Sequence, residues 1–269
     1  MDSTTQILTV LILLITMVLV VIITQFARRR RSLYVLRPLP AYRLIPTAIG
    51  ESIEANRPVH ISLGAAGLGG FETLTALAAA ELAYQAASRA IIGGVSPIVT
   101  ISDPTALPLA QDTLRRAAAA RGLLKSGAAR DARWYPAGSS GLAFAAALSG
   151  MLPDDRVAAS ILVGSFGTEL ALIAETSARR GQRLIAGTDT LQGQAVAYVM
   201  ADAPLIGEEI YMAGAYLGDS AVQMAGAVVQ DILRWLLILA IFVPTALAVG
   251  DAILNGRFSA ALARLLGGG

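Results

Sequence analysis

Two long uncharged segments, one near each end of the chain, enclose a middle part in which short apolar runs alternate with segments of helical periodicity. Residues 3–27 carry no charged side chain, and about 20 such residues span the roughly 30 Å hydrocarbon core of a bilayer. An arginine run follows at once, whereas a cleaved signal peptide carries its positive charge before the apolar run. We therefore expect an uncleaved N-terminal transmembrane anchor over 1–27 and a basic juxtamembrane segment over 28–43.

The second uncharged segment lies near the C-terminus. Residues 235–250 carry no charge, which predicts a second transmembrane helix over 231–255 with a kink at Pro244; a buried helix of a soluble domain is the alternative. No break signal separates this span from a preceding helix over 219–233. The segment 256–269 places Phe258 and three leucines beside Arg257 and Arg264, which predicts an amphipathic tail at the membrane interface.

Positive residues beside a span stay on the cytoplasmic side of a membrane. This rule places both termini outside and residues 44–230 in the cytoplasm, with the plasma (inner) membrane as the expected location and the lipid bilayer as a partner. The residues that set this topology are Arg28, Arg29, Arg30 and Arg31.

The middle part has the alternation of an α/β domain. Apolar, β-branched runs predict strands at 58–63, 97–101, 133–135, 157–163 and 183–186. Helical periodicity predicts helices at 71–90, 105–121, 139–151, 168–180, 190–201 and 205–217. This spacing suits successive βαβ units, and nearly continuous apolar strands suit a sheet covered on both faces. The predicted fold is α/β, a doubly wound, mainly parallel, Rossmann-like sheet flanked by an N-terminal and a C-terminal transmembrane helix.

Ligands of doubly wound sheets bind at the carboxyl ends of the strands. The first predicted strand is followed there by Gly64, Gly67, Gly69 and Gly70, and the second by Asp103, where a ribose-binding acid would lie. Glycines let the backbone approach an anion at a helix N-terminus, which predicts a nucleotide or phosphate ligand. The spacing is neither G-x-G-x-x-G nor a P-loop. The alternative is that these are turn and packing glycines and that Asp103 caps a helix.

Polar residues follow the other strands too. Each can cap a helix, and together they can line a crevice with the glycine loop; paired carboxylates there can serve acid–base chemistry or bind Mg²⁺, although no spacing is diagnostic. These candidate ligand-binding residues are Ser139, Ser140, Thr168, Glu169, Thr188, Asp189, Glu208 and Glu209.

Composition narrows the chemistry. The 269 residues include no cysteine, which excludes thiolate metal sites and Cys nucleophiles, and one histidine, His60, which leaves little basis for a Ser-His-Asp triad or a zinc site. His60 lies inside the first predicted strand, where we expect a core or surface role. We assign no catalytic residue and no metal ligand, and the cofactor is unknown.

Charge is sparse. Charged residues make up 15% of the chain, against about 25% in an average soluble domain, and residues 44–230 are similarly poor in charge. We therefore expect sister subunits, a partner or the bilayer to cover part of the surface, and we favour a homo-oligomer. Acidic residues outnumber basic ones in 44–230, which argues against a nucleic-acid partner.

The string PLIGEEIYMAGAYL at 204–217 stands out beside the first span, the Arg57–Pro58 pair, the glycine loop and the segment 188–202. With these features, the chain resembles an uncharacterised family of bacterial membrane-anchored proteins, a domain of unknown function. The resemblance implies a membrane location and carries over no activity or catalytic residue. Its most distinctive pair is Glu208–Glu209, and the Ala-rich middle departs from its pattern.

Three functions remain open at this point. The first is a non-enzymatic, membrane-anchored oligomeric scaffold with a cytoplasmic α/β domain. The second is a membrane-anchored sensor that binds a nucleotide or other anion at the glycine loop. The third is a membrane-bound hydrolase that uses the carboxylates at the strand ends.

Overall fold

The computed structural model describes residues 3–29, 37–124, 131–218 and 221–253. They fall into two compact units, one over Leu36–Ser220 and the other made of the two terminal segments, Met1–Val35 and Ala221–Gly269. The predicted amphipathic tail, 256–269, and two of the four arginines, Arg30 and Arg31, lie outside the described residues.

The first unit is built on a six-stranded sheet. Its strands are β1 (Val59–Gly64), β2 (Ile98–Ile101), β3 (Ala132–Trp134), β4 (Ala159–Ser165), β5 (Arg183–Thr188) and β6 (Ala203–Leu205). Every neighbouring pair is parallel, in the order β3-β2-β1-β4-β5-β6. This is the strand order of the doubly wound Rossmann fold, and it reverses between β1 and β4. The predicted α/β fold with a Rossmann-like parallel sheet is therefore confirmed.

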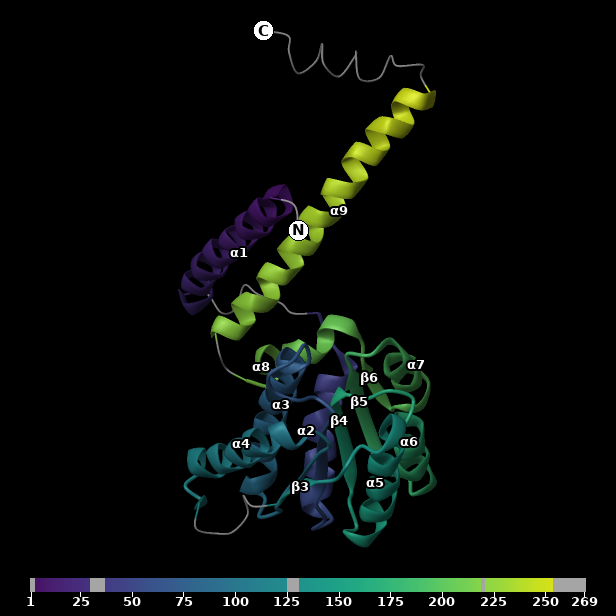
Figure 1. Cartoon of the computed structure of the whole chain (residues 1–269). Helices are drawn as coiled ribbons and strands as arrows, with labels where there is room; N and C mark the ends of the chain where they lie inside the picture. The colour runs from purple at the N-terminus through teal and green to yellow at the C-terminus, as the bar shows by residue number, and fades with distance from the viewer. Residues whose placement is uncertain (1–2, 30–36, 125–130, 219–220, 254–269) are drawn as a thin grey trace. The chain divides into compact units, whose positions relative to one another are not determined.

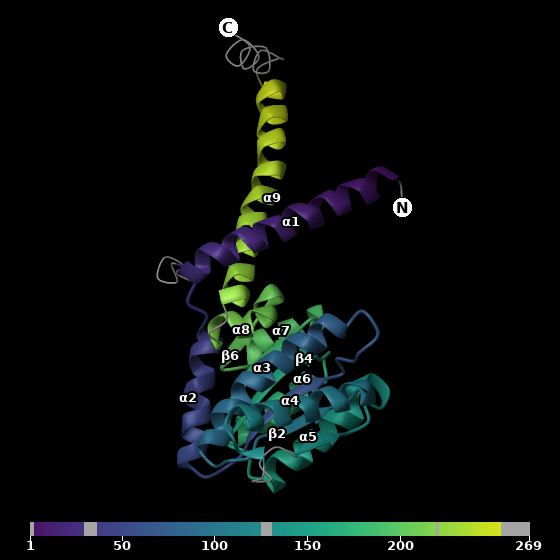
Figure 2. The same cartoon turned by 90° about the vertical axis from the view of Figure 1, so that its left-hand side faces the viewer.

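Helices cover both faces of the sheet (Figures 1 and 2). One face carries α2 (Pro40–Glu54), α3 (Thr73–Ile92), α4 (Leu107–Ala120) and the short α8 (Ala213–Tyr216), and the other carries α5 (Leu142–Asp154), α6 (Leu170–Arg179) and α7 (Leu191–Met200). Side chains of β4 alternate between the two cores, so that Ile161 packs toward α2 and α3 while Leu162 packs toward α5 and α6.

Helix α2 and strand β6 were not predicted, and the prediction of one helix over 205–217 is wrong. Helix α2 has apolar residues at helical spacing and begins with Pro40, which suits the first turn of a helix, but its internal Pro46 is typical of a helix break. The segment 205–217 is not one helix. It begins inside strand β6, and Gly207, at φ +60°, opens the 3-10 helix η5 (Gly207–Met212) that precedes α8. A three-residue edge strand with a proline at its centre gives too weak a pattern to be predicted.

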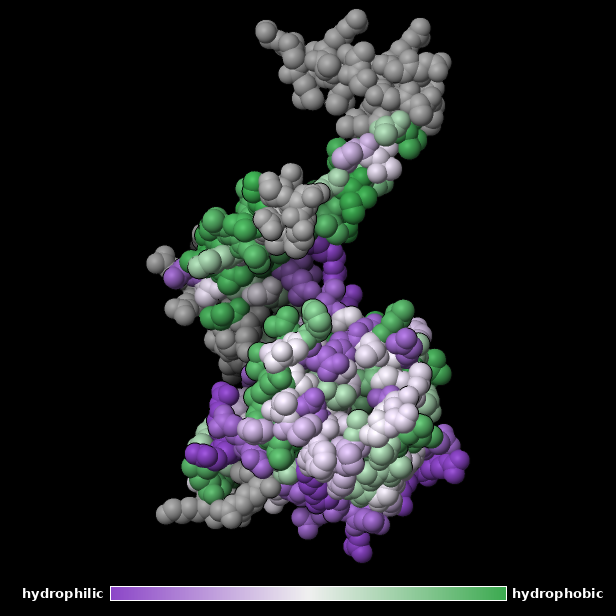
Figure 3. All heavy atoms as spheres, viewed as in Figure 1, coloured by the Kyte–Doolittle hydropathy of each residue, from purple (hydrophilic) through white to green (hydrophobic). Residues whose placement is uncertain are grey.

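The second unit consists of two long helices, α1 (Ser3–Arg29) and α9 (Ala221–Ile253), and Figure 3 shows hydrophobic residues gathered on both. The helices pack through Ile23 of α1 and through Ala225 and Val229 of α9. Helix α9 contains an apolar stretch long enough to cross a membrane, Met224–Ala246, whereas the apolar stretch of α1, Val10–Gln25, is shorter. The structure thus supports one membrane-spanning helix by length and composition, and the α1 span and its topology remain predictions.

Candidate functional site

The carboxyl edge of the sheet is where the predicted site residues end up, and Gly64 marks its centre. This residue ends β1 at the point where the strand order reverses, with φ at +60°. A Cβ at this position would lie 2.2 Å from the carbonyl oxygen of Ser165 at the end of β4. The amide of Ala65 donates to the same carbonyl at 2.8 Å. Gly64 therefore allows β1 and β4 to approach closely where they diverge into different loops.

The glycine loop is tied to the end of β2. Asp103 accepts hydrogen bonds from the amide and the hydroxyl of Thr105, at 2.7 and 2.5 Å, and so caps a 3-10 helix, η2 (Pro104–Ala106). The same hydroxyl accepts from the amide of Leu68 at 2.8 Å. Gly67 fits against the carboxyl group of Asp103, since a Cβ there would lie 2.6 Å from the carboxyl carbon. Asp103 thus belongs to the loop's own hydrogen-bond network.

This network decides how many donors the glycine loop offers to an anion. The amide of Leu68 is taken by Thr105, and the amide of Gly69 donates to the hydroxyl of Thr73 at 3.0 Å. A bound phosphate would have to displace these hydroxyls and would meet the carboxylate beside Gly67. Gly70 is exposed and borders the start of α3, whose N-cap residue makes no side-chain capping bond. The loop has the position of a phosphate site but only part of its chemistry.

Glu169 lies near the loop that contains Ser139 and Ser140. Its Oε1 accepts from the amide of Gly167 at 2.7 Å, and a Cβ at Gly141 would lie 2.7 Å from its carboxyl carbon. Both serines and Thr168 are exposed. Ser140 has φ at 50°, a left-handed backbone conformation that costs an L residue about 1 kcal/mol or more. The structure therefore brings together the predicted residues that follow β3 and β4.

The residues at the end of β5 form a different group. Thr188 is fully buried and its hydroxyl exchanges hydrogen bonds with the backbone of Phe166, at 2.9 Å in each direction. Asp189 accepts from the hydroxyl of Thr75 on α3 at 2.9 Å, and that hydroxyl lies 3.3 Å from the hydroxyl of Tyr211. The other carboxyl oxygen of Asp189 is buried and has no hydrogen-bond partner within the described ranges.

Glu209 joins the two ends of the α/β unit. Its carboxylate contacts the guanidinium of Arg37 at 2.5 Å and accepts from the amide of Ile206 at 3.1 Å. The hydroxyl of Tyr42 donates to the Glu209 carbonyl, and the hydroxyl of Tyr216 donates to the Arg37 carbonyl at 2.6 Å.

Within this cluster the rings of Tyr42 and Tyr216 are stacked, with centroids 4.9 Å apart. Burial raises the pKa of Tyr42, and the charge of Glu209 raises it further. Glu208 precedes Glu209 on η5 and is half-buried. Because Arg37 and Tyr216 are hydrogen-bonded, the chain enters and leaves the α/β unit at neighbouring points, and Glu209 pairs with Arg37 there.

The predicted carboxylates therefore have different partners rather than one shared centre. Asp103 bonds to Thr105, Glu169 to Gly167 and Asp189 to Thr75. Within the described residues there is no group of three or more His, Asp or Glu side chains that could hold a metal ion. Sequence reasoning missed Thr75 and Tyr211 because each comes from a helix whose place beside β5 only the topology reveals.

An exposed apolar surface also lies at this edge, over the glycine loop and the first turns of α3. We name it the apolar row; its members, three residues apart, are Leu68, Phe71, Leu74 and Leu77. Phe71 is fully exposed and Leu74 is 71% exposed. Leu74 and Leu77 belong to α3, whereas Leu68 and Phe71 precede it, and the four exposed side chains form an apolar patch of the kind that can serve as an interaction surface.

Comparison with known proteins identifies a family but no individual protein that matches the chain. The model of a family described as Domain of unknown function (DUF6754) matches residues 2–257. No curated protein and no solved structure matches the chain.

Proposed function

For this chain, which belongs to the DUF6754 family of unknown function, we propose a role as a membrane-anchored, non-enzymatic scaffold subunit that self-associates through the apolar row of its α/β unit. The single observation that carries this proposal is the full exposure of Phe71 beside the exposed Leu74. The surface lies at the edge of the sheet where ligands of this fold normally bind. Here that edge carries exposed hydrocarbon beside polar side chains that bond to one another or to the backbone.

The energetics favour a covered surface. Burying one leucine or phenylalanine side chain contributes about 1.5–3 kcal/mol. Two such residues on each of two subunits therefore supply several kcal/mol, enough to drive association when spans already confine the subunits to a membrane. Confinement matters because it raises the effective concentration of one α/β unit near another.

The membrane part of the proposal rests on α9 and on the arginine run. Helix α9 contains the apolar stretch Met224–Ala246, and we propose α1 as a second span in the same bilayer. Arg28 and Arg29 at the end of α1, with Arg30 and Arg31 after them, favour a cytoplasmic α/β unit with both termini outside. The proposed location is the plasma membrane of a bacterium.

The test is the mass of the detergent-solubilised full chain by light scattering, compared between three proteins. We expect the wild type to form one defined oligomer and the double variant Phe71→Ser with Leu74→Ser to fall to a smaller species. The matched control is Leu191→Ser with Val199→Ser, which removes two equally exposed apolar side chains from α7. The control should keep the wild-type mass. A monomeric wild type, or equal losses in both variants, would contradict the proposal.

A second candidate is the sensor that binds a nucleotide or other anion, and one observation favours it. The strand order reverses between β1 and β4, and the glycine loop begins at that point. The occupied amides of Leu68 and Gly69 count against it. A rise in thermal stability with one nucleotide of a panel, reduced in Asp103→Asn, would favour the sensor. The carboxylate-dependent hydrolase has no comparable support, because its candidate acids have separate partners.

A further inference from the structure

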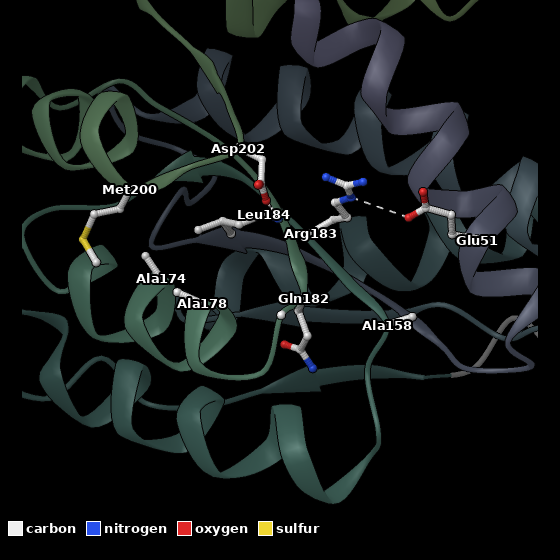
Figure 4. Close-up of a pocket in the computed structure, with 10 residues that line it drawn as sticks. Glu51, Ala158, Ala174, Ala178, Gln182, Arg183, Leu184, Met200 and Asp202 are labelled. Carbon is white, nitrogen blue, oxygen red and sulfur yellow. Dashed lines mark hydrogen bonds and ion pairs between the residues drawn. The ribbon is translucent and has the colours of Figure 1, made fainter.

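A cavity of about 430 Å³ opens at the amino edge of the sheet, opposite the edge described above (Figure 4). Its charged side chains have partners within the chain. Arg183 lies 3.6 Å from Glu51, and Asp202 accepts from the amide of Leu184 at 2.7 Å. Figure 4 shows Gln182 and Asp202 pointing apart, so the polar side chains of this cavity do not converge on one ligand.

A cavity of the same volume lies along the first turns of α2, and we name it the α2 groove. It is lined by Pro38, Pro40, Arg43, Leu44 and Thr47. Because residues 40, 43, 44 and 47 are three or four positions apart on one helix, their side chains share a face. The lining is therefore one continuous surface of a single element.

Arg43 gives the α2 groove its charge, since the lining contains no acidic residue. The guanidinium of Arg43 has no ion-pair or hydrogen-bond partner in the described part of the chain, whereas the neighbouring Arg37 is paired with Glu209. The hydroxyl of Thr47 donates to the carbonyl of Arg43 at 3.3 Å, which leaves the guanidinium to donate to a ligand. A guanidinium presents paired N–H donors that match the oxygens of a phosphate, so the groove fits an anion.

The rest of the lining is apolar. Pro38 and Pro40 are exposed, and Leu44 is half-buried and packs against the core beneath α2. An inorganic anion gains nothing from contact with such a wall, whereas an anion that carries hydrocarbon does. The charge and the wall together favour an amphiphilic anion.

Few residues of the chain separate the α2 groove from the proposed spans. Pro38 follows Arg31, the last residue of the arginine run, by seven positions. The carbonyl of Arg37 accepts from the hydroxyl of Tyr216, which precedes Met224, the first residue of the apolar stretch of α9, by eight positions. On the proposed topology, the groove therefore belongs to the part of the α/β unit that meets the headgroups of the cytoplasmic leaflet, whose surface is negative.

We propose that the α2 groove binds the headgroup of an anionic phospholipid. The guanidinium of Arg43 donates to the phosphate, and the hydrocarbon next to the phosphate packs against the proline rings and Leu44. This proposal rests on the proposed membrane location. It is independent of self-association through the apolar row, which uses other residues.

The experiment uses the absence of cysteine from the chain. Thr47→Cys places one thiol in the α2 groove. Thr176→Cys places a matched thiol on α6, because the hydroxyl of Thr176 also donates to the carbonyl four residues before it. N-ethylmaleimide labels the full chain in detergent, with and without dihexanoylphosphatidylglycerol. Dihexanoylphosphatidylcholine and inorganic phosphate are the comparison probes.

Two further changes test the charge. Arg43→Gln, added to Thr47→Cys, removes the cation of the groove, and Arg115→Gln removes an exposed arginine of α4 as the matched control. The arginine run is intact in every variant, so its own attraction for anionic lipid cancels in the comparison. Calorimetry of the wild type and Arg43→Gln with the same probes repeats the test without a cysteine.

We expect dihexanoylphosphatidylglycerol to protect Thr47→Cys from labelling and to leave the labelling of Thr176→Cys unchanged. The concentration needed for protection should rise about fivefold with Arg43→Gln and stay the same with Arg115→Gln.

Three results would overturn the proposal. Equal protection by dihexanoylphosphatidylcholine would show that the anionic headgroup is not recognised, and equal protection by inorganic phosphate would show a site for the free anion. Absence of protection, or protection that Arg43→Gln does not weaken, would show that the groove does not bind the lipid. Extraction of the chain from membranes by alkaline carbonate would instead contradict the membrane location itself, so the two failures are distinguishable.

Discussion

Acidification is predicted to destabilise the α/β unit through its single histidine. His60 lies on β1 and is fully buried, with its Nε2 atom 2.7 Å from the hydroxyl of Thr100 and its Nδ1 atom without a partner within the described residues. Burial and the charge of Arg133 both lower the pKa of His60, Asp155 raises it by a smaller amount, and together they bring it from 6.5 to about 3. The folded protein therefore keeps a neutral imidazole at pH values where the unfolded chain takes up a proton.

The sign and size of the effect follow from these two pKa values. Because the unfolded state binds the extra proton, the free energy of unfolding falls as the pH drops below 6.5 and reaches its full loss near pH 3. Between pH 7 and pH 5 the loss is about 2 kcal/mol, and the whole shift corresponds to about 5 kcal/mol. A loss of 2 kcal/mol is a large share of the stability of an ordinary domain.

Two measurements on the full chain in detergent test this reasoning. Because the chain has one histidine, NMR of the labelled imidazole reports its pKa directly, and we expect no titration between pH 5 and 8. Urea unfolding at pH 7 and pH 5 should show the loss of about 2 kcal/mol. The loss should be much smaller in His60→Gln, which stays polar but does not titrate. An imidazole that titrates near 6.5 in the folded protein, or an equal pH dependence in His60→Gln, would refute the argument.

Three further predictions concern the same unit. Gly64→Ala should lower the free energy of unfolding by about 2 kcal/mol more than Gly181→Ala in thermal or urea unfolding, because both glycines have φ at +60° but only Gly64 has a carbonyl oxygen where the Cβ would be. Equal losses would show that backbone conformation alone matters. Arg133→Gln should raise the pKa of His60 in the NMR titration, since it removes a cation that acts on the imidazole; an unchanged or lower pKa would contradict this. Glu209→Gln should cost under about 1 kcal/mol in urea unfolding, because its partner Arg37 is largely exposed and glutamine still accepts from the Ile206 amide. A loss of several kcal/mol would show that Glu209 carries more than this ion pair.

Periodicity was enough to predict the sheet but not its edges. The runs that became β1 and β4 are apolar, bounded by turns and followed by helical patterns, so their type and order were readable. Helix α2 was not predicted, because Pro46 argues against a helix. Its buried face, which includes Tyr42 and Ile45, nevertheless has regular helical spacing. Strand β6 is stabilised by pairing with β5 rather than by its own sequence, and pairing cannot be seen in a short run.

The sequence predicted which edge of the sheet the candidate residues occupy, but not which residues contact one another there. The rule that parallel strands end at one edge correctly placed Gly64, Asp103 and Asp189 there. It did not reveal their partners, because Thr75 reaches Asp189 across 114 positions in the chain and Arg37 reaches Glu209 across 172. The exposure of Phe71 and Leu74 was not predicted either, since leucines at helical spacing predict a buried face. His60 was expected in the core or at the surface, and it lies in the core.

The central claim is that the apolar row forms an interface between copies of the chain in the membrane. Because the chain has no cysteine, Leu74→Cys introduces a single thiol into the row, and Leu191→Cys introduces a matched one on α7. A short bis-maleimide applied to native membranes should link Leu74→Cys into dimers and leave Leu191→Cys as a monomer. Absence of linkage in Leu74→Cys, or equal linkage in both variants, would contradict the account.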